Sequence, residues 1–360
     1  MTQRTALIMA GGTGGHIFPG LAVAEALRAQ GWHVHWLGAP APSMESQLVP
    51  PRGFDFETVA FGGVRGKGVK TLALLPLKLL RAFWQSWSVV RRVKPDVVVG
   101  LGGYITFPAG MMAVLAGKPL VLHEQNSIAG MANKVLSGVA DRVFSAFPHV
   151  MPKAEWVGNP LRAGFVTQPE PAQRYAPRTG PLQVLVVGGS LGAQALNEAV
   201  PKALALISPD QRPVVTHQSG TKQIDALRAA YEEAGVQANL TPFIDDTAQA
   251  FADADLVIAR AGASTVTELA AVGVPAIYVP FPHAVDDHQT TNARFVVDAG
   301  GGWLVPQSQL DAQDLANRIQ FMTRRTLQAT AEKAYAVRQV EATQHVVQAC
   351  EQLAKKKDHA

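Results

Sequence analysis

Two glycine-rich stretches, each directly after an apolar run, could bind an anion. The first, AGGTGGH, holds Gly11, Gly12, Gly14 and Gly15 with His16 behind them, and the second, GGSLGAQ, spans 188–194. A glycine-rich turn lets backbone N–H groups approach a phosphate closely, and the helix that follows points its positive end at the same place. The alternative is that the glycines only permit tight strand-to-helix turns. Two such loops at equivalent positions favour ligand binding.

Neither loop has the spacing of a dinucleotide or ATP site. After Gly12 and Gly14, the third glycine position of G-x-G-x-x-G holds Ile17. The next strand-like run, HVHWLG, is followed by Ala39 and Pro40, where a nicotinamide enzyme would have an acid for the adenosine ribose. There is no G-x-x-x-x-G-K-[ST] stretch either. The pattern therefore argues against a nicotinamide enzyme and an ATPase.

A third stretch, IARAGASTVTE at 258–268, could bind a ribose. It is typical of a strand that ends at Gly262 and opens a helix. We expect Ser264 and Thr265 to cap this helix and Glu268 to lie in its first turn. A carboxylate there can accept two hydrogen bonds from vicinal hydroxyls. The alternative for Glu268 is a capping or dipole-stabilising acid.

The segment HAVDDHQTTNA at 283–293 places many polar groups after an apolar run. Sugar hydroxyls could be contacted by Asp286, Asp287, His288, Gln289 and Asn292. The alternative is a solvated loop with a helix cap. His283 and His288 also suggest a metal, but without a further matching cluster this spacing is weak and we predict none. Asp253 and Asp255 precede their strand, so we expect both to be structural.

Polar residues also follow two strand-like runs of the first half. Gly102 and Gly103 come after one run, and His123, Glu124, Gln125 and Asn126 come after the next. Buried polar groups at strand ends must be hydrogen-bonded. These side chains therefore either line a cleft between domains or pack loop against loop.

The motifs lie on two series of alternating strands and helices. TALIMA, HVHWLG, DVVVGLG, LVLHE and RVFSAF are strand-like in the first half, and LQVLVVGG, PVVTHQSG, DLVIARAG, PAIYVPF and GWLVP in the second. Continuous apolar runs separated by helices indicate parallel strands covered on both faces. We predict an α/β fold of two doubly wound, Rossmann-like domains with a cleft between them and ligands at the carboxyl ends of the strands.

The domain boundary is expected near residue 163. The stretch AGFVTQPEPAQRYAPRTGP holds Pro169, Pro171, Pro177 and Pro181 and is typical of an interdomain linker. It gives a first domain over 1–162 and a second over 163–342. A last helix over 343–357 could return to pack on the first domain.

The composition is that of a globular protein. Of 360 residues, 48% are apolar and 17% charged, which is ample for buried cores and gives no case for disorder. A single cysteine, Cys350, excludes an internal disulfide and fits a reducing compartment. We expect neither a secretory signal in residues 1–30 nor a membrane-spanning helix, which needs roughly 20 apolar residues. The net charge of +4 is mildly basic.

One segment is both basic and apolar. Between Thr58 and Pro95 there is no acidic residue, and the eight basic ones are Arg65, Lys67, Lys70, Lys78, Arg81, Arg91, Arg92 and Lys94. On a helix, one apolar stripe would hold Leu72, Leu75, Leu79 and Phe83, while Leu74, Leu77 and Trp84 lie off it. The segment is either a surface that dips into an anionic membrane interface or a buried crossover helix with a basic rim. Nucleic-acid binding is disfavoured because the aromatics lie in an aliphatic helix.

Taken together and in order, the motifs resemble the MurG family. They are AGGTGGHIFPGLAVAEAL, GGY, HEQNSIAG, VGNPLR, VVGGSLGAQ, HQSG, FIDD, RAGASTVTE and PFPHAVDDHQTTNA, over roughly residues 5–300. This family comprises peptidoglycan N-acetylglucosaminyltransferases of GT-B architecture that make lipid II from lipid I. The resemblance implies inverting transfer from UDP-N-acetylglucosamine to undecaprenyl-pyrophosphoryl-MurNAc-pentapeptide, with no cofactor. It also implies peripheral attachment to the cytoplasmic face of the bacterial inner membrane, here through region 65–94. Candidate partners are cell-wall and division proteins. We expect no nucleic-acid partner.

The resemblance further assigns roles to residues. Ser190 with its loop, together with Arg162, would hold the pyrophosphate, Ile244 would meet the uracil through its backbone, and Glu268 would bind the ribose. The sugar would lie against Gln289 and Asn292. The other implied nucleotide and cleft residues are Ala263, Ser264, Thr265, Val266 and Thr267, and, from the first domain, Thr13, Gly14, Gly15 and Asn126.

Two positions depart from the family pattern. Thr106 and Phe107 stand where members usually have a small residue and glycine before the proline, which bears on acceptor contacts. Ala261 stands where many members have serine, which removes one hydroxyl near the donor. The polar set is otherwise intact, so we expect an active enzyme.

A general base must take the acceptor proton. His16 is the first candidate, since a helix N-terminus favours the neutral, basic imidazole; its alternative role is only to position phosphate or cap the helix. Glu124 is the second candidate base. Charge on the leaving pyrophosphate would be stabilised by the second glycine loop, its helix dipole and Arg162. Two competing functions remain: a UDP-N-acetylglucosamine epimerase of the same fold, and a non-catalytic cell-wall scaffold.

Overall fold

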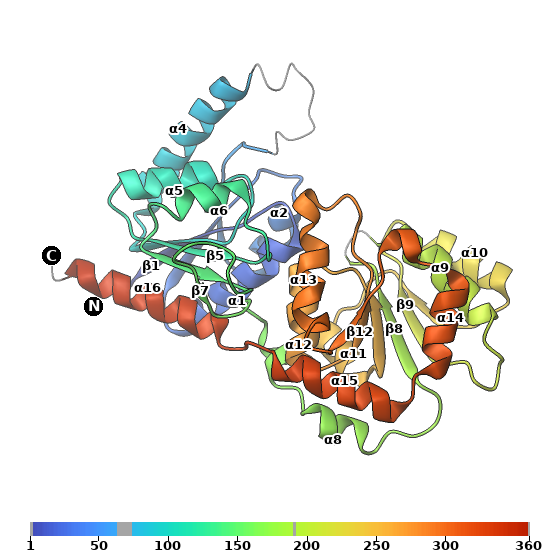
Figure 1. Ribbon diagram of the computed structural model, residues 1–360. Coiled ribbons are helices and arrows are strands. Elements are labelled where there is room, and N and C mark those ends of the chain that lie inside the picture. The colour runs from blue at the N-terminus through green and yellow to red at the C-terminus, as the bar shows by residue number, and fades with distance from the viewer. Residues whose placement is uncertain (1–2, 63–73, 190–191, 359–360) are drawn as a thin grey trace. The chain divides into compact units, whose positions relative to one another are not determined.

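The computed structural model describes residues 3–62, 74–189 and 192–358 (Figure 1). The chain forms two compact units, of which unit 1 comprises Met1–Arg162 with Val340–Ala360 and unit 2 comprises Ala163–Gln339. Each unit contains one parallel sheet whose strand order identifies a doubly wound domain. The predicted α/β fold class is therefore confirmed.

The sheet of unit 1 has seven strands in the order β3-β2-β1-β4-β5-β6-β7. They are β1 (Thr5–Met9), β2 (His33–Gly38), β3 (Asp55–Thr58), β4 (Val97–Gly100), β5 (Leu120–Glu124), β6 (Arg142–Ser145) and β7 (Glu155–Trp156). The helices are α1 (Gly14–Ala29), α2 (Met44–Leu48), α4 (Leu75–Val93), α5 (Thr106–Leu115), α6 (Met131–Leu136) and α16 (Ala342–Asp358), with a short 3-10 turn, η1 (Pro50–Arg52). The strand order reverses between β1 and β4, where Met9 pairs with Gly100. The loops after these two strands therefore begin side by side.

Two hydrophobic layers cover the sheet of unit 1. On one face, Ala6 and Ile8 of β1 pack with α1 and α16. On the other, Leu7 and Met9 pack with α4, α5 and α6. This two-sided burial explains why the strands are continuously apolar rather than alternating.

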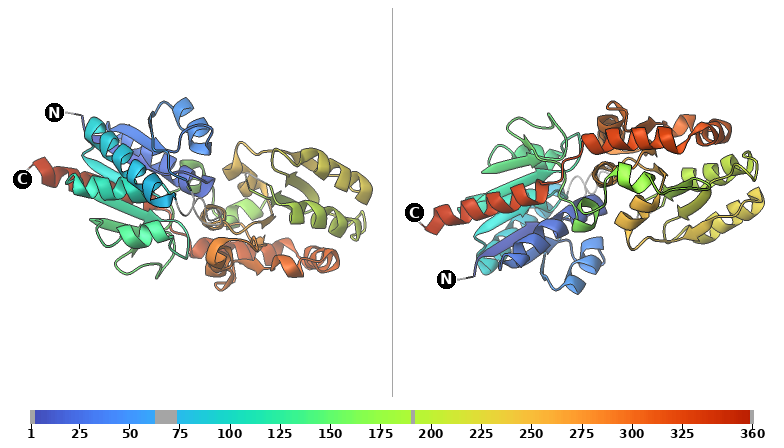
Figure 2. Two further views of the ribbon diagram at one scale, coloured as in Figure 1. Left: turned by 90° about the horizontal axis from the view of Figure 1, so that it is seen from above. Right: turned by 90° about the horizontal axis from the view of Figure 1, so that it is seen from below.

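The last helix completes the first of these layers. Val346, Val347 and Cys350 of α16 are buried in the same cluster as Leu21 of α1, and Figure 2 shows the two helices side by side along the sheet. Burial raises the pKa of the Cys350 thiol to about 12. The C-terminal segment thus belongs to unit 1, from Val340 onward.

The sheet of unit 2 has six strands in the order β10-β9-β8-β11-β12-β13. They are β8 (Gln183–Val187), β9 (Val214–Gln218), β10 (Asn239–Thr241), β11 (Leu256–Ala259), β12 (Ala276–Tyr278) and β13 (Gly302–Leu304). The helices are α7 (Ala163–Val166), α8 (Pro171–Tyr175), α9 (Gln194–Ala205), α10 (Ile224–Ala234), α11 (Thr247–Asp253), α12 (Ala263–Val272), α13 (His288–Val297), α14 (Ala312–Phe321) and α15 (Arg324–Ala336), with 3-10 turns η2 (Val285–Asp287) and η3 (Gln307–Gln309). Here the order reverses between β8 and β11, which pair directly.

The sequence analysis did not predict three strands of the described residues, and their position in the sheets explains why. β3, β7 and β10 carry the sequences DFET, EW and NLT and lie at the edges of their sheets. An edge strand is short and partly solvated, so it lacks the continuous apolar run on which the prediction relied.

The proline-rich stretch after residue 163 is not a loose linker, which corrects the expectation. It forms α7 and α8 within unit 2. Arg174 is buried there and donates to the carbonyls of Ala252, Val272 and Gly273. These bonds fasten the segment to the amino-end side of the sheet.

Asp255 has the structural role that was expected of it. Its carboxylate is fully buried, accepts a hydrogen bond of 2.8 Å from the Gln183 N–H, and pairs with Arg178 and Arg324 at 2.7 and 3.2 Å. It therefore ties β8, β11 and two outer segments together at the amino end of the sheet. None of the helices within the described residues is long and apolar enough to cross a membrane.

Candidate active site

The first glycine loop connects β1 to α1 and already holds a carboxylate. Glu45 of α2 is buried, and it accepts hydrogen bonds from the N–H groups of Gly12 (3.2 Å) and Ala39 (2.9 Å). A Cβ at Gly11 would lie 2.5 Å from this carboxylate. Sequence reasoning missed Glu45, because nothing local to MESQL indicates that it reaches the loop. Part of the predicted anion cradle is thus used internally, by Glu45.

The remaining part of the loop opens α1. Thr13 is the N-cap residue but makes no side-chain capping bond, and Gly14 and Gly15 form the start of the helix. The first N–H groups of a helix have no intrahelical acceptor. The predicted ligand residues Thr13, Gly14 and Gly15 are partly or fully exposed, as a binding site requires.

The loop after β4 packs tightly against this first loop. Gly102 and Gly103 have φ values of +97° and +95°, which favour glycine. A Cβ at Gly102 would lie 2.7 Å from His16 Nδ1, and one at Gly103 would lie 2.6 Å from the Gly11 carbonyl oxygen. The Thr106 hydroxyl donates to the Gly102 carbonyl at 2.8 Å. For this loop, packing against the first loop is the observed role, and Thr106 secures it.

A hydrogen-bonded chain of buried side chains leads from β5 to His16. His16 Nδ1 lies 2.8 Å from Gln125 Oε1, and Gln125 Nε2 lies 3.0 Å from His123 Nδ1. His123 Nε2 lies 2.8 Å from the Gly158 carbonyl oxygen. Burial lowers the pKa of His123 to about 4. The sequence placed these residues at strand ends but could not show that they contact one another.

Glu124, the second candidate base, is enclosed by donors. Its carboxylate is buried and accepts from the N–H groups of Asn126 (2.9 Å) and Gly130 (3.1 Å) and from Asn133 Nδ2 (2.9 Å). Asn126 Nδ2 also lies 3.5 Å from it. This carboxylate therefore holds the loop that follows β5.

Arg162 ends the first unit, next to α1. Its guanidinium carbon lies 5.1 Å from the centroid of the Phe18 ring, within the range of a cation–π contact. Phe18 follows His16 by less than one helical turn. The cation predicted for the pyrophosphate thus lies against the helix that carries the candidate base.

In unit 2, the loop after β8 is held by the loops after β9 and β10. Ser190 lies outside the described residues. Gly192 has a φ of +77°, and a Cβ there would lie 2.0 Å from the Ser219 carbonyl oxygen. Gln218 Nε2 donates to the carbonyls of Gly189 and Pro242, both at 3.1 Å. These contacts hold Gly189 and Gly192 of the second glycine-rich stretch in place before α9.

The start of α12 corrects two expectations. Gly262 is the N-cap residue, whereas Ser264 and Thr265 lie inside the first turn, because the chain turns into the helix one residue after Gly262. Glu268 is the sixth residue of α12 and lies in its second turn, not its first. It is partly exposed, as are Ser264 and Thr265.

The residues 263–268 differ in what they can offer a ligand. Ala263, Val266 and Thr267 are buried, and Thr267 Oγ1 donates to the Ala263 carbonyl at 2.9 Å, so a ligand can meet these three only through the backbone. The Ser264 hydroxyl is shielded from solvent and has no hydrogen-bond partner within the described part of the chain. Since buried polar groups are normally satisfied, a hydroxyl of this kind at a helix N-terminus suits hydrogen bonding to an anion.

The helix α13, which follows β12, presents one of its two predicted sugar contacts and buries the other. Gln289 Oε1 accepts the Phe281 N–H at 2.9 Å, which leaves its amide nitrogen as a donor for a ligand. Asn292 is completely buried, and its Nδ2 donates to the Ala261 carbonyl at 3.2 Å. Asn292 therefore supports the loop between β11 and α12. Ile244 lies partly exposed in the loop between β10 and α11.

Arg260 is a residue that the sequence analysis missed. It directly follows β11, and its guanidinium donates to the carbonyls of Val279 and Pro280, both at 3.1 Å, and to Gln307 Oε1 at 2.6 Å. Burial lowers its pKa below the usual value for arginine. The sequence signal that could have identified Arg260 is a single basic residue directly after a buried apolar strand. Arg260 thus fixes the start of the loop that leads from β12 to α13, the helix that carries Gln289.

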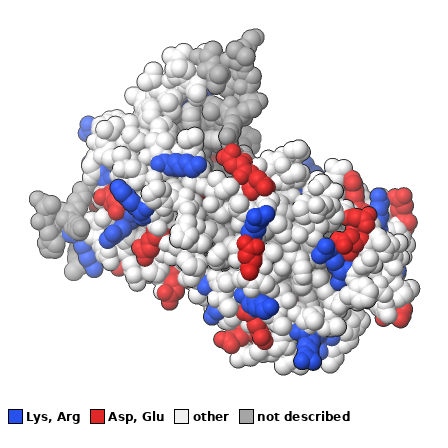
Figure 3. Space-filling view, in the orientation of Figure 1, with Lys and Arg blue, Asp and Glu red and all other residues white. Residues whose placement is uncertain are grey.

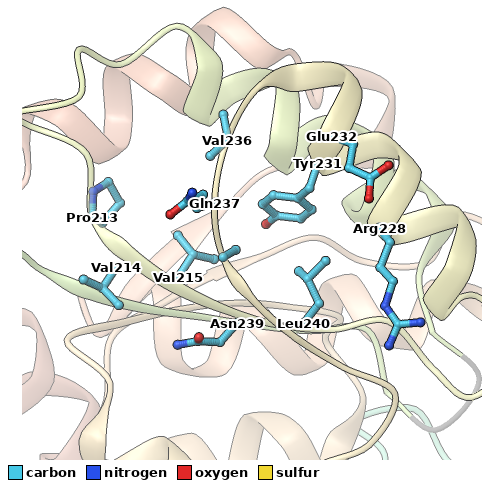
Figure 4. A pocket seen from close by; sticks show the side chains of 11 residues that line it. Pro213, Val214, Val215, Arg228, Tyr231, Glu232, Val236, Gln237, Asn239 and Leu240 are labelled. Carbon is cyan, nitrogen blue, oxygen red and sulfur yellow. The ribbon is translucent and has the colours of Figure 1, made fainter.

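Two other features lie at the amino ends of strands, away from these loops. A pocket of about 540 Å³ is lined by Pro213, Val214, Val215, Arg228, Tyr231, Glu232, Val236, Gln237, Ala238, Asn239 and Leu240 (Figure 4). One group among the described residues could hold a metal: His33, His35 and Asp55 on β2 and β3. His33 Nε2 and Asp55 Oδ2 already contact each other at 2.7 Å. Ligands of doubly wound sheets bind at the carboxyl ends, so neither feature belongs to the predicted site.

Comparison with known proteins defines the class. Residues 6–145 match the glycosyltransferase family 28 N-terminal domain, and residues 183–352 match the glycosyltransferase family 28 C-terminal domain. The chain belongs to glycosyltransferase family 28 and is a glycosyltransferase of GT-B architecture.

Individual similar proteins carry the name of one particular glycosyltransferase. The chain is 71% identical to a UDP-N-acetylglucosamine--N-acetylmuramyl-(pentapeptide) pyrophosphoryl-undecaprenol N-acetylglucosamine transferase of Polaromonas sp. (strain JS666 / ATCC BAA-500), over 98% of this chain and 92% of the relative. It is 62% identical to the protein of that name from Cupriavidus metallidurans, over 99% of this chain and 100% of the relative. The crystal structure of Acinetobacter baumannii MurG matches with a TM-score of 0.83 at 40% identity, covering 97% of this chain and 99% of that one.

Proposed function

We propose that this chain transfers N-acetylglucosamine, with inversion, from UDP-N-acetylglucosamine to the lipid I acceptor, giving lipid II for peptidoglycan. The identity of 71% over 98% of the chain to a transferase named for this reaction carries the proposal. The loops at the carboxyl ends of both sheets supply groups that suit a sugar nucleotide and a proton transfer.

The donor is proposed to bind the loops of unit 2. The shielded Ser264 hydroxyl and the N-terminus of α12 suit a phosphate oxygen. Glu268, one turn further along α12, is partly exposed and suits the ribose hydroxyls. Gln289 keeps its amide nitrogen for the sugar, while Asn292 and Arg260 hold the surrounding loops. Ile244 and the loop of Ser190 are proposed to complete the nucleotide site, with Arg162 on the pyrophosphate.

His16 is the better candidate for the general base. It lies in the first turn of α1, is only half-buried, and is held through Nδ1 by Gln125. The Glu124 carboxylate, in contrast, is buried and engaged by backbone and asparagine donors. A base must be within hydrogen-bond reach of the acceptor hydroxyl, and an enclosed carboxylate does not meet this condition.

The decisive experiment measures UDP release from UDP-N-acetylglucosamine with and without lipid I. We expect release that depends on lipid I, with label transferred to the lipid. Isomerisation of the donor sugar without lipid I would indicate the epimerase, and absence of any UDP release would indicate the non-catalytic scaffold.

Replacement of His16 tests the base. His16→Ala should lower kcat by about 10²–10⁴-fold, the usual contribution of a general base, with little change in the Kd of UDP-N-acetylglucosamine. His33→Ala, at the amino end of β2, is the matched control and should keep wild-type kcat. If His16→Ala turns over normally, another group is the base.

The chain is also proposed to attach to the cytoplasmic face of the inner membrane through α4. Leu74, Leu77, Leu80 and Trp84 are 50%, 65%, 64% and 71% exposed, and Lys78 and Arg81 are exposed beside them. On the face shown in Figure 3, the surface around α4 and α5 carries few charged side chains. Apolar residues flanked by cations suit an anionic bilayer interface. The alternative of a fully buried crossover helix does not agree with these exposures, while Arg65, Lys67, Lys70 and Leu72 lie outside the described residues.

A further inference from the structure

We propose that Gln125 and His123 act as positioning residues that fix the tautomer of His16. In this tautomer Nδ1 carries the hydrogen and Nε2 carries the lone pair that accepts the proton of the acceptor hydroxyl. The catalytic meaning rests on the proposed function, because it takes His16 as the base. The hydrogen-bond chain itself stands on the geometry of unit 1 alone.

The carbonyl of Gly158 determines the tautomer of His123. A carbonyl oxygen can only accept, so His123 Nε2, which lies 2.8 Å from it, must carry a hydrogen. The imidazole of His123 is completely buried and is neutral near pH 7, because burial lowers its pKa to about 4. A neutral imidazole has one N–H, so His123 Nδ1 is an acceptor.

This acceptor determines how the Gln125 amide is oriented. Gln125 Nε2 lies 3.0 Å from His123 Nδ1 and also 3.0 Å from the His123 carbonyl oxygen. Both partners are acceptors, so the atom between them is the NH₂ group and uses its two hydrogens there. A flipped amide would set its oxygen against two acceptors. The side chain is only 1% exposed, so water cannot relieve such a contact.

The amide oxygen is therefore the atom that faces His16. Gln125 Oε1 lies 2.8 Å from His16 Nδ1 and can only accept, so Nδ1 must donate. In the neutral imidazole the lone pair then lies on Nε2. Gly102 also packs closely against this part of the ring, since a Cβ there would lie 2.7 Å from Nδ1 and 2.8 Å from Cε1. An acceptor hydroxyl can consequently use only the Nε2 side.

The proton movement balances within this arrangement. The O–H bond of the acceptor breaks and its hydrogen moves to Nε2, while the oxygen bonds to the anomeric carbon and UDP leaves with the bonding electrons. His16 becomes an imidazolium that still donates from Nδ1 to Gln125. The amide does not take up a proton, so Gln125 and His123 orient the base without relaying charge.

Nuclear magnetic resonance of the full chain labelled with ¹⁵N in its histidine rings tests the tautomer directly. The His16 signals are assigned by their loss in His16→Gln. We expect Nδ1 of His16 to be protonated and Nε2 unprotonated at a pH where the ring is neutral, and the reverse for His123. A His16 ring protonated at Nε2 in the wild type would overturn the proposal without need of any variant.

Two variants of Gln125 separate positioning from packing. Gln125→Met keeps the length of the side chain but removes its acceptor, and should shift His16 toward the other tautomer. It should lower kcat by about 10-fold or more, a part of the full contribution of a general base, with the KM for the donor nearly unchanged. Gln125→Glu keeps an oxygen facing Nδ1, so His16 should retain the wild-type tautomer. Its second carboxyl oxygen replaces the amide nitrogen beside His123 Nδ1, so a hydrogen must then lie between these two atoms, and the His123 signals of the same spectra report this change. An unchanged tautomer in Gln125→Met would contradict the proposal.

The role of His16 as base and its positioning by Gln125 are distinguished by different results. If His16→Ala keeps its turnover while the spectra show the expected tautomers, the assignment of the base is wrong and the hydrogen-bond chain is right. If His16→Ala is inactive and the wild-type spectra show the opposite tautomer, the base stands and the proposed positioning does not.

Discussion

The role proposed for His16 depends on a neighbour that has no side chain. Gly102 has a φ of +97°, and a Cβ there would lie 2.7 Å from Nδ1 of the imidazole. A methyl group there meets a ring that is already held by Gln125, and the ring can yield only by giving up that hydrogen bond. Glycine at this position is thus needed both for the backbone conformation and for the close approach.

Gly102→Ala should therefore lower kcat by at least about 10-fold, because His16, the proposed base, loses its orientation. Gly31→Ala is a matched control. Gly31 has a φ of +84°, so it suffers similar backbone strain, but a Cβ there has no neighbour within 4 Å. If the two variants lose activity equally, strain alone accounts for the effect and the contact with His16 does not matter. The readouts are kcat and the temperature of unfolding.

At the scale of elements, α4 divides its apolar residues between two surfaces. Ala82, Val89 and Val90 pack into unit 1, whereas Leu77, Leu80 and Trp84 face outward. A helix that only covers a sheet does not need the second surface. The division follows from the position of α4 on the sheet, which lets one side of the helix reach the core.

Replacing Leu77 and Leu80 together by Glu should weaken binding to vesicles that contain phosphatidylglycerol by at least about 10-fold, since burying a leucine is worth about 1.5–3 kcal/mol. Flotation of the protein with the vesicles measures this binding. Phe321→Glu, at an 82% exposed residue of α14, is the control and should bind as the wild type does. Equal binding by all proteins would remove α4 as the contact. Turnover with a water-soluble acceptor analogue should not change.

At the scale of the whole molecule, the chain returns to the unit in which it began. α16 supplies Val346, Val347 and Cys350 to the core shared with β1 and α1. The chain therefore joins the two units twice, after Arg162 and after Gln339. The fold of unit 1 is complete only when the last helix has been synthesised.

A chain that ends at Gln339 should lose the cooperative folding of unit 1. Val346 and Val347 contribute about 1.5–3 kcal/mol each, and the buried alanines and Cys350 add to this, so the loss is a large part of the total stability of about 5–15 kcal/mol of a typical domain. Hydrogen exchange measured by mass spectrometry should show β1 and β4 unprotected, with β8 and β11 still protected. A chain that ends at Lys355 keeps the α16 residues of this core and should exchange as the full chain does. Protection of β1 in the shorter chain would contradict the role of α16.

The sequence by itself determined the series of buried strands, the two doubly wound domains and the loops that hold the polar residues. It could do so because continuous apolar runs and glycine turns report local burial and backbone conformation. Edge strands such as β3 and β10 were missed because they are short and partly solvated. The cap of α12 was misjudged by two residues, since Ser264 resembles a cap in sequence while Gly262 has the extended backbone of one.

Only the tertiary structure decided which polar residues meet. His16 and Gln125 are hydrogen-bonded although 109 positions separate them in the sequence, and the Gly12 N–H donates to Glu45, which lies 33 positions away. Neither pairing leaves a local signal, because the order of strands in the sheet, rather than their order in the chain, brings loop ends together. Burial likewise depends on how the loops pack. Glu124 and Asn292 are buried, whereas His16 and Gln289 are partly exposed. This difference favours His16 as the candidate base and Gln289 as the candidate sugar contact.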